Sequence, residues 1–162
     1  MVDVKSRLAT AQWVLERTLG WISAAEIKVG VIVTIDVGML GGLAAAFAAT
    51  PKKTPWVYVL AISAAALAVV ALGCAAYAVK PRLDGPKKSL LFFGRITDLP
   101  RADFVDRFKT ESDEELLDDW TEQIHRNAEI AKEKHAWVTK AMAWSFLSAI
   151  PWVLAVAILA NA

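Results

Sequence analysis

Three long apolar stretches dominate the pattern of hydrophobic and polar positions along this chain of 162 residues. Residues 29–49 contain a single charged side chain, Asp36, and residues 55–79 and 141–160 contain none. A helix needs about 20 apolar residues to cross a hydrocarbon core roughly 30 Å thick, so each stretch predicts a transmembrane helix. Only residues 50–54 join the first two stretches, which must therefore form a tight hairpin.

The basic residues predict how these helices are oriented. Residues 80–140, between the second and third stretches, hold twelve of the 18 Lys and Arg residues. Residues 1–28 hold four, and the hairpin holds Lys52 and Lys53. Because basic residues near membrane helices stay on the cytoplasmic side, we expect the N-terminus and residues 80–140 inside, and the hairpin and C-terminus outside.

The polar segments predict two further helical regions. Behind a cap at Asp3, an apolar stripe at three- and four-residue spacing consists of Val4, Leu8, Ala11, Leu15, Leu19 and Ile22. Ser112 and Glu115 form a capping box, which predicts the start of a helix from about 113 to about 160. The stripe of that helix consists of Leu116, Leu117, Trp120, Ile124, Ala128, Ala131, His135 and Val138.

The segment before the capping box is less regular. Two prolines and a glycine exclude regular structure between residues 80 and 89. Residues 90–96 are apolar and aromatic, and a buried turn, a strand and an interfacial anchor all fit them. Pro100 suits the first turn of a short helix to about Lys109, with Phe104, Val105 and Phe108 facing inward.

These elements predict an all-α membrane protein. It has three transmembrane helices, an N-terminus inside the cell, and helices extended into a cytoplasmic helical module. The expected division is a cytoplasmic N-terminal helix 1–28, transmembrane helix 29–49, external hairpin 50–54, transmembrane helix 55–79, cytoplasmic loop and stalk helix 80–140, and transmembrane helix 141–160.

Composition and motifs argue against several other classes. The formal net charge of +1 gives no reason to expect nucleic-acid binding. The only cysteine, Cys74, lies within the second apolar stretch and allows no intrachain disulfide. His125 and His135 are ten residues apart and cannot share a metal from one helix face. There is no glycine-rich phosphate loop or nucleophile elbow. We therefore expect no enzyme, no catalytic residues, no metal and no cofactor.

Three motifs carry a resemblance to a known family. They are Ala25-Glu26-Ile27-Lys28, then Leu91-Phe92-Phe93-Gly94-Arg95-Ile96, then Gln123-Ile124 followed by Asn127-Ala128-Glu129-Ile130-Ala131-Lys132-Glu133-Lys134. In these motifs and in the spacing of its apolar stretches, the chain resembles the transmembrane effectors of Pycsar antiphage systems. Glu26 stands where that family usually has Asp, and His135 where Tyr is common.

The resemblance implies a two-part bacterial defence system. A partner pyrimidine nucleotide cyclase makes cyclic CMP or cyclic UMP on infection, and the effector responds by impairing the inner membrane. Three thin helices cannot enclose an ion path, so a pore needs a homo-oligomer in contact with membrane lipid. The alternative is a non-channel membrane component, such as a scaffold or an accessory subunit of a transporter.

Several residues are candidates for binding such a nucleotide. An apolar surface suits the base, and a cation or N–H groups suit the phosphate. The candidates are Glu26, Lys28, Phe92, Phe93, Arg95, Trp120, Asn127 and Lys134. The alternative roles are interfacial anchoring for Glu26 and Lys28, core packing for the aromatic loop, and a solvated helix face for Asn127 and Lys134.

The first apolar stretch carries its own candidates. Gly38 and Gly42 form a G-x-x-x-G pair, a pattern that permits close helix packing in lipid. Asp36 is the only ionisable residue deep in any stretch, and such residues face a protein interior or a water-filled cavity. Asp36 either lines a path between subunits or is hydrogen-bonded within one subunit.

Overall fold

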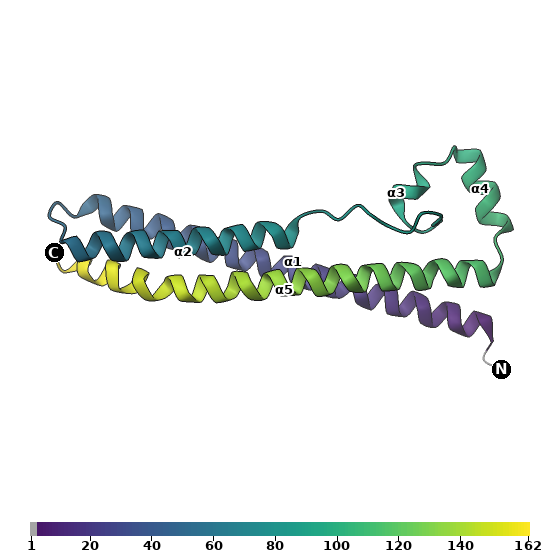
Figure 1. The fold of residues 1–162 in the computed structure, drawn as a ribbon, viewed down its shortest axis with the longest axis horizontal. Coiled ribbons are helices and arrows are strands. Elements are labelled where there is room, and N and C mark those ends of the chain that lie inside the picture. Colours follow the sequence, from purple (N-terminus) through teal and green to yellow (C-terminus); the bar gives the residue numbers. More distant parts are fainter. Residues whose placement is uncertain (1–2) are drawn as a thin grey trace. The chain divides into compact units, whose positions relative to one another are not determined.

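The structure, a computed structural model, describes residues 3–162 and contains only helices and connecting segments within that range. The helices are α1 (Val4–Ala49), α2 (Pro55–Val79), α3 (Phe93–Ile96), α4 (Arg101–Thr110) and α5 (Asp113–Ala160), shown in Figure 1. Residues 1 and 2 of the expected 1–28 segment lie outside the described residues.

Three of these helices are long and apolar enough to cross a membrane, namely α1, α2 and α5. Large apolar side chains on them face outward, including Ile35, Ile62 and Phe146, as is required of surfaces in contact with lipid. The prediction of an all-α membrane protein with three spanning helices is thereby confirmed.

The chain divides into two compact units. The first contains the residues up to Ala24 together with Pro81–Glu133, and the second contains Ala25–Lys80 and Lys134–Ala162. Helices α1 and α5 contribute residues to both units, because each is a single uninterrupted helix. The structure thus confirms that one helix runs from about 113 to about 160.

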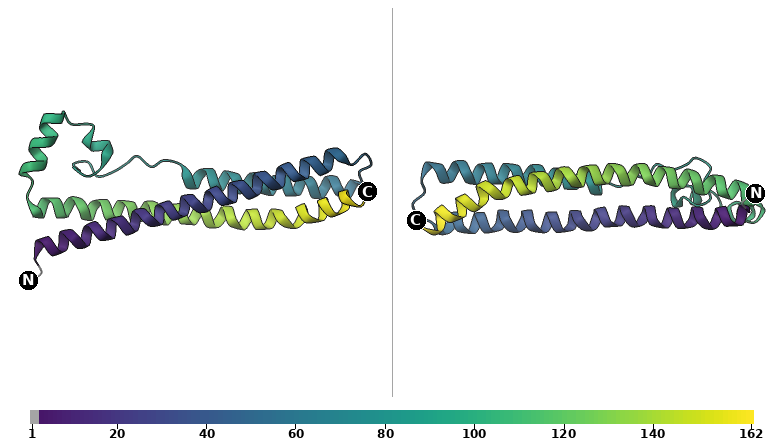
Figure 2. Two further views of the ribbon diagram at one scale, coloured as in Figure 1. Left: turned by 180° about the vertical axis from the view of Figure 1, so that it is seen from behind. Right: turned by 90° about the horizontal axis from the view of Figure 1, so that it is seen from below.

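The second unit is a bundle of three helices that lie side by side in all views (Figures 1 and 2). One core cluster includes Ala25, Val29, Ala75, Ala78 and Ala141, and another centres on Leu43, Val57 and Ala155. Small side chains at these positions let the helix backbones approach closely. At the hairpin end, the Thr50 hydroxyl donates to the carbonyl of Leu159 at 3.2 Å, which ties the hairpin to α5.

The first unit contains the short helices. Ser112 and Glu115 form the predicted capping box: the Ser112 N–H donates to Glu115 Oε2 at 3.0 Å, and the Glu115 N–H donates to Ser112 Oγ at 3.3 Å. These reciprocal hydrogen bonds satisfy backbone donors that the first helical turn leaves unpaired.

Two inward positions expected from the pattern are wrong. Phe108 is 50% exposed, because its ring packs beside Phe104 on the same short helix, with centroids 5.8 Å apart, instead of against the rest of the unit. Leu19 is 46% exposed, whereas Thr18 is buried and bonds the carbonyl of Val14 at 2.8 Å. The buried stripe of α1 is therefore rotated slightly from the one that hydrophobicity alone predicts.

Candidate functional site

Residues 89–92 form a turn followed by α3, so no strand forms here. The expected buried turn fits Ser89 and Leu90, whereas the residues of α3 are not buried and Phe93 is exposed. Ser89 is buried, and its Oγ accepts hydrogen bonds from the backbone N–H groups of Leu91 and Phe92 at 3.0 and 2.8 Å. Gln123 of α5 donates to the same Oγ at 2.9 Å. The Leu90 N–H donates to Asp119 Oδ2 at 2.8 Å. These contacts fix the aromatic turn on α5.

The ring of Phe92 lies between two glycines. A Cβ atom added at Gly85 would lie 2.5 Å from Phe92 Cδ1, and one added at Gly94 would lie 2.7 Å from Phe92 Cε1. Any larger residue at either position would have to displace the ring. Phe92 is thus locked in place by the backbone, whereas the neighbouring Phe93 is 63% exposed.

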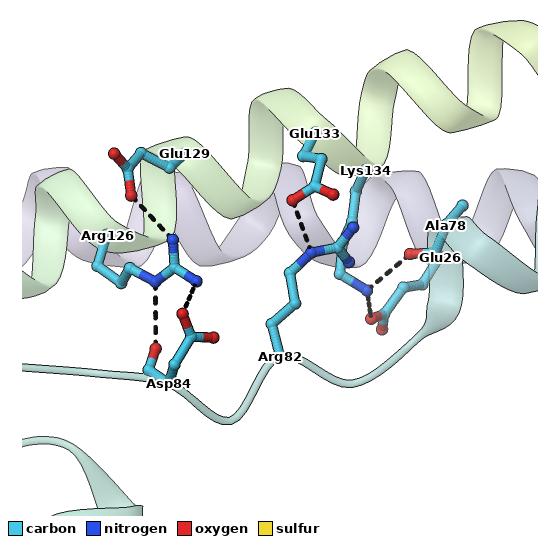
Figure 3. A network of polar contacts seen from close by, with 8 residues as sticks. All are labelled: Glu26, Ala78, Arg82, Asp84, Arg126, Glu129, Glu133 and Lys134. Carbon is cyan, nitrogen blue, oxygen red and sulfur yellow. Dashed lines mark hydrogen bonds and ion pairs between the residues drawn. The ribbon is translucent and has the colours of Figure 1, made fainter.

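Residues 81–88, which we call the strap, link α2 to the aromatic turn and are held on α5 by two arginines (Figure 3). Arg126 donates from Nε to the backbone carbonyl of Asp84 at 3.1 Å and from Nη2 to its carboxylate. Its Nη1 donates to Glu129 at 2.9 Å. Arg82, within the strap, donates to Glu133 at 2.9 Å.

These ion pairs shift the titration of the groups involved. The hydrogen bond from Arg126 lowers the pKa of Asp84, and the hydrogen bond from Arg82 lowers the pKa of Glu133. Hydrogen bonds to Asp84 and, to a smaller extent, to Glu129 raise the pKa of Arg126. The carboxylates themselves are largely exposed, at 74% for the side chain of Asp84 and 56% for that of Glu133.

A pocket of about 280 Å³ lies within the first unit beside the strap. Its apolar wall consists of Leu15, Leu19, Leu91, Phe92, Phe93 and Ile130, and its polar groups come from Arg82, Asp84, Gln123, Arg126 and Asn127, with Gly85 completing the lining. Ligand pockets typically combine an apolar surface with a few placed polar groups in this way. The volume is just below the usual range of about 300–1,000 Å³ for drug-sized ligands, which favours a small one.

Three of the sequence-predicted ligand residues meet in this pocket, namely Phe92, Phe93 and Asn127. The side-chain amide of Asn127 donates to the backbone carbonyl of Gln123 at 2.8 Å, and both residues line the pocket. Arg95 instead pairs with Asp98 one turn away at 2.9 Å, and neither Arg95 nor the half-buried Trp120 lines the pocket.

The remaining candidates belong to the second unit. Lys134 is buried, and its ammonium donates to Glu26 at 2.9 Å and to the carbonyl of Ala78 at 3.0 Å (Figure 3). Lys134 thereby joins α5 to α1 and to the end of α2. Lys28 is exposed and borders an apolar groove of about 440 Å³ between α1 and α5, lined largely by side chains such as Ile35 and Phe146.

The candidates in the first apolar stretch, Asp36, Gly38 and Gly42, lie on α1 within the second unit. Asp36 is fully buried within the chain and accepts a 2.8 Å hydrogen bond from Ser145, which matches the alternative of a bond within one subunit. A Cβ at Gly42 would make ordinary contact with Trp152, at 3.7 Å, and a Cβ at Gly38 would meet nothing within 4 Å. The Trp152 indole donates to the carbonyl of Met39 at 2.7 Å, so Gly42 faces a side chain of α5 in the same chain.

Sequence reasoning missed Arg82, Arg126 and Gln123 as pocket residues. Gln123 belongs to a quoted motif and Arg126 lies between its two parts, whereas Arg82 lies in the proline-rich linker. Polar residues on a helix or in such a linker usually face solvent. The available signal was that Gln123, Asn127, Ile130 and Lys134 repeat at three- and four-residue spacing, which places them on one side of α5. Among residues 3–162, no group of three or more His, Cys, Asp and Glu side chains is arranged to hold a metal ion.

The fold and the pocket together define a multi-pass membrane protein with a small, partly polar pocket. The family model for the Pycsar effector protein domain, PycTM, matches residues 10–161, and the chain therefore belongs to that family. It is an antiphage defence effector of a family associated with cyclic pyrimidine nucleotide signalling, which is not a known family of enzymes. No curated protein and no solved structure matches the chain.

Proposed function

We propose that this effector senses cyclic CMP or cyclic UMP in the strap pocket and responds by impairing the bacterial inner membrane as a homo-oligomer. The observation that carries the proposal is the combination of an exposed aromatic ring, Phe93, with two arginines, Arg82 and Arg126, around one pocket of mononucleotide size.

The aromatic wall supplies a surface for the base. Phe92 is fixed by Gly85 and Gly94, and the more exposed Phe93 lies beside it with ring centroids 4.9 Å apart. A pyrimidine that stacks on Phe93 would gain about 1–3 kcal/mol, the usual worth of one base on one aromatic ring. Asn127 and Gln123 provide amide groups for the edge of the base, since both can donate and accept hydrogen bonds.

The arginines supply the complement to the phosphate. A cyclic phosphodiester carries one negative charge shared by two oxygens, a geometry that a guanidinium can meet with two parallel hydrogen bonds. Arg126 presents its side chain at 28% exposure and Arg82 at 12%, so a phosphate bound there would be partly shielded from water. Shielding strengthens the attraction between the charges.

The membrane part of the proposal rests on the spanning helices. With twelve of 18 basic residues in positions 80–140, the pocket belongs on the cytoplasmic side, where a pyrimidine nucleotide cyclase would release its product. The bundle of the second unit is filled by small side chains such as Ala71, Ala75 and Ala141, which allow close packing of its helices. Damage to the membrane would therefore involve several copies of the chain.

The test is direct binding and membrane leakage with the full-length protein in lipid. Purified protein in nanodiscs is titrated with cyclic CMP, cyclic UMP, cyclic AMP and cyclic GMP by calorimetry, and liposomes holding it are assayed for dye release. We expect micromolar or tighter binding of one pyrimidine nucleotide, weaker binding of the purines, and leakage that follows occupancy. Absence of binding by both cyclic pyrimidines would refute the proposal.

A pair of matched variants locates the base. Phe93→Ala removes the exposed ring that lines the pocket, and we expect it to weaken binding roughly 5- to 150-fold, the equivalent of one lost stacking contact. Leu83→Ala is the control, because Leu83 is an exposed apolar side chain of the strap, at 68%, that does not line the pocket. Equal effects of the two variants would place the base elsewhere.

A further inference from the structure

The arginines that line the pocket are already occupied by carboxylates of the chain itself. Asp84 is both a pocket-lining residue and the partner of Arg126, which it binds through its side chain and its backbone carbonyl. Arg82 is held by Glu133 in the same manner through Nε. An anionic ligand that reaches the arginines must therefore share them with Asp84 and Glu133 or replace these groups.

We infer that the phosphate of the ligand exchanges with Asp84 on Arg126 and with Glu133 on Arg82, and that this exchange releases Asp84, and with it the middle of the strap, from α5. The inference rests on the proposed function, because it takes the pocket ligand to be a cyclic nucleotide. In the ligand-free protein, Asp84 and Glu133 act as internal substitutes for the phosphate.

The exposure of the carboxylates makes the exchange feasible. Ion pairs whose carboxylate is solvated contribute little to stability, because water competes for both partners. Asp84, Glu129 and Glu133 are each more than half exposed and regain full hydration once they let go of the guanidinium. The arginines are the less exposed partners and remain charged. A partly buried charge without a partner is unfavourable, and the phosphate would supply that partner.

Two polar side chains of the strap take part in its contacts with α5. Arg82 donates to Glu133, and Asp84 accepts from Arg126 through its carboxylate and its backbone carbonyl, while Gly85 packs beneath Phe92. Position 82 lies three residues beyond Val79, the last residue of α2. Release of Asp84 thus loosens the segment that directly follows a membrane-spanning helix.

Affinity measurements on carboxylate variants test the exchange, because exchange predicts that loss of a carboxylate makes the ligand bind more tightly. If the phosphate must displace Asp84, then Asp84→Asn removes a competitor, and we expect binding of the preferred cyclic pyrimidine to become roughly two- to fivefold tighter, the worth of one exposed ion pair. Glu133→Gln should act alike, and the double variant should combine the two gains. If Asp84 instead positions Arg126 for the ligand, its loss weakens binding.

Asp98→Asn is the matched control. It removes the same charge from an arginine pair of the same unit, at the same 2.9 Å separation as Arg82 and Glu133, but Arg95 and Asp98 do not line the pocket. The control should leave the affinity unchanged. A gain as large as that of Asp84→Asn would mean that overall charge, and not exchange at Arg126, controls binding.

Hydrogen exchange of the strap amides provides the second measurement. Addition of the nucleotide should speed exchange in residues 84–88 of the parent protein, and the double variant should show fast exchange without ligand. Slower exchange in the presence of ligand would overturn the inference, because the strap would then close over the ligand. If the parent protein binds a cyclic pyrimidine and Asp84→Asn binds it equally well or more weakly, the exchange is refuted but the proposed function is not. If the parent protein binds neither cyclic pyrimidine, both are refuted.

Discussion

Ser145 donates a 2.8 Å hydrogen bond to Asp36 and thereby joins α5 to α1 through the only Asp, Glu, Lys or Arg side chain within the apolar stretches. Asp36 is fully buried, and its second carboxylate oxygen has no hydrogen-bond partner among the described residues. The Ser145 hydroxyl is therefore the contact that satisfies this carboxyl group inside the bundle. A polar group in such a place is costly unless it is bonded.

Removal of the Ser145 hydroxyl should lower the stability of the helix bundle. Ser145→Ala leaves Asp36 buried without a donor, and we expect it to lower the free energy of unfolding by about 1–3 kcal/mol. The control is Thr34→Val, because Thr34 is an exposed residue of the same stretch whose hydroxyl bonds only the carbonyl of Gly30 in its own helix, at 2.9 Å. Thermal unfolding in detergent compares the two, and equal effects would contradict the role of Ser145.

Lys134 should be a structural residue of the bundle. Its ammonium is 4% exposed and makes hydrogen bonds to Glu26 and to the carbonyl of Ala78. Lys134→Ala should destabilise the protein strongly, because it removes the donor on which the Ala78 carbonyl depends. Exchange of the two residues, Glu26→Lys with Lys134→Glu, should not restore stability, since a carboxylate cannot donate to that carbonyl. Lys28→Ala, at an exposed position, is the control in the same thermal assay.

The membrane topology is testable with cysteines at exposed positions. In a Cys74→Ala background, we expect an impermeant reagent outside the cell to label Lys52→Cys and to spare Lys88→Cys, because basic residues keep positions 80–140 in the cytoplasm. Lys88 is preferable to its neighbour Ser89, which is buried and bonded. Labelling of position 88 from outside would reverse the predicted orientation and remove the pocket from the compartment of the cyclase.

Much of this fold follows from the sequence, for identifiable reasons. The apolar stretches, Pro55 at the start of α2 and the capping box at Ser112 are local signals, and the structure has α2 and α5 where they predict them. The wrong expectations concern which side of a helix faces inward. At Phe108 and Leu19, hydrophobicity favoured burial, but hydrophobicity alone does not determine which side of a helix the rest of the unit covers.

The residues of the pocket were harder to predict from the sequence than the helices. The motif around Phe92 and Phe93 could be read from the chain, but the pairing of Arg126 with Asp84 spans 42 residues and that of Arg82 with Glu133 spans 51. Arg95 had the better local context, next to two aromatic rings, yet it is held by Asp98. Long-range pairing of charged residues leaves no periodic trace in a single sequence.

The attachment of the strap should depend on pH. Arg126 and Arg82 lower the pKa values of Asp84 and Glu133 below their ordinary values of about 3.9 and 4.3. Lowered pKa values mean that the stabilisation is complete above those ordinary values and is lost as the pH falls and the carboxylates take up protons. A spin label at position 87, in the Cys74→Ala background, should become more mobile below about pH 4. The Asp84→Asn, Glu133→Gln double variant should show high mobility from pH 7 downwards, and a parent protein that stays folded and immobile at pH 3 would contradict the expectation.

The close packing of Phe92 on Gly85 should make that glycine essential to the pocket. Gly85→Ala places a methyl group 2.5 Å from the ring, a distance that real Cβ contacts do not show, so the ring must move and disturb the wall that Phe92 and Phe93 form. Overpacking of this kind costs about 1–3 kcal/mol. We expect lower stability and weaker ligand binding, both measured on purified protein in nanodiscs.

A second glycine provides the control for that variant. Gly20 lies in the interior of α1, and a Cβ there would meet nothing within 4 Å, so Gly20→Ala should stabilise the helix by up to about 1 kcal/mol. Phe92→Leu, a shorter side chain, should recover part of the stability lost in Gly85→Ala while it lowers that of the parent protein. Independent, additive effects of Gly85→Ala and Phe92→Leu would show that the two residues do not touch, because contacting residues couple and distant ones do not.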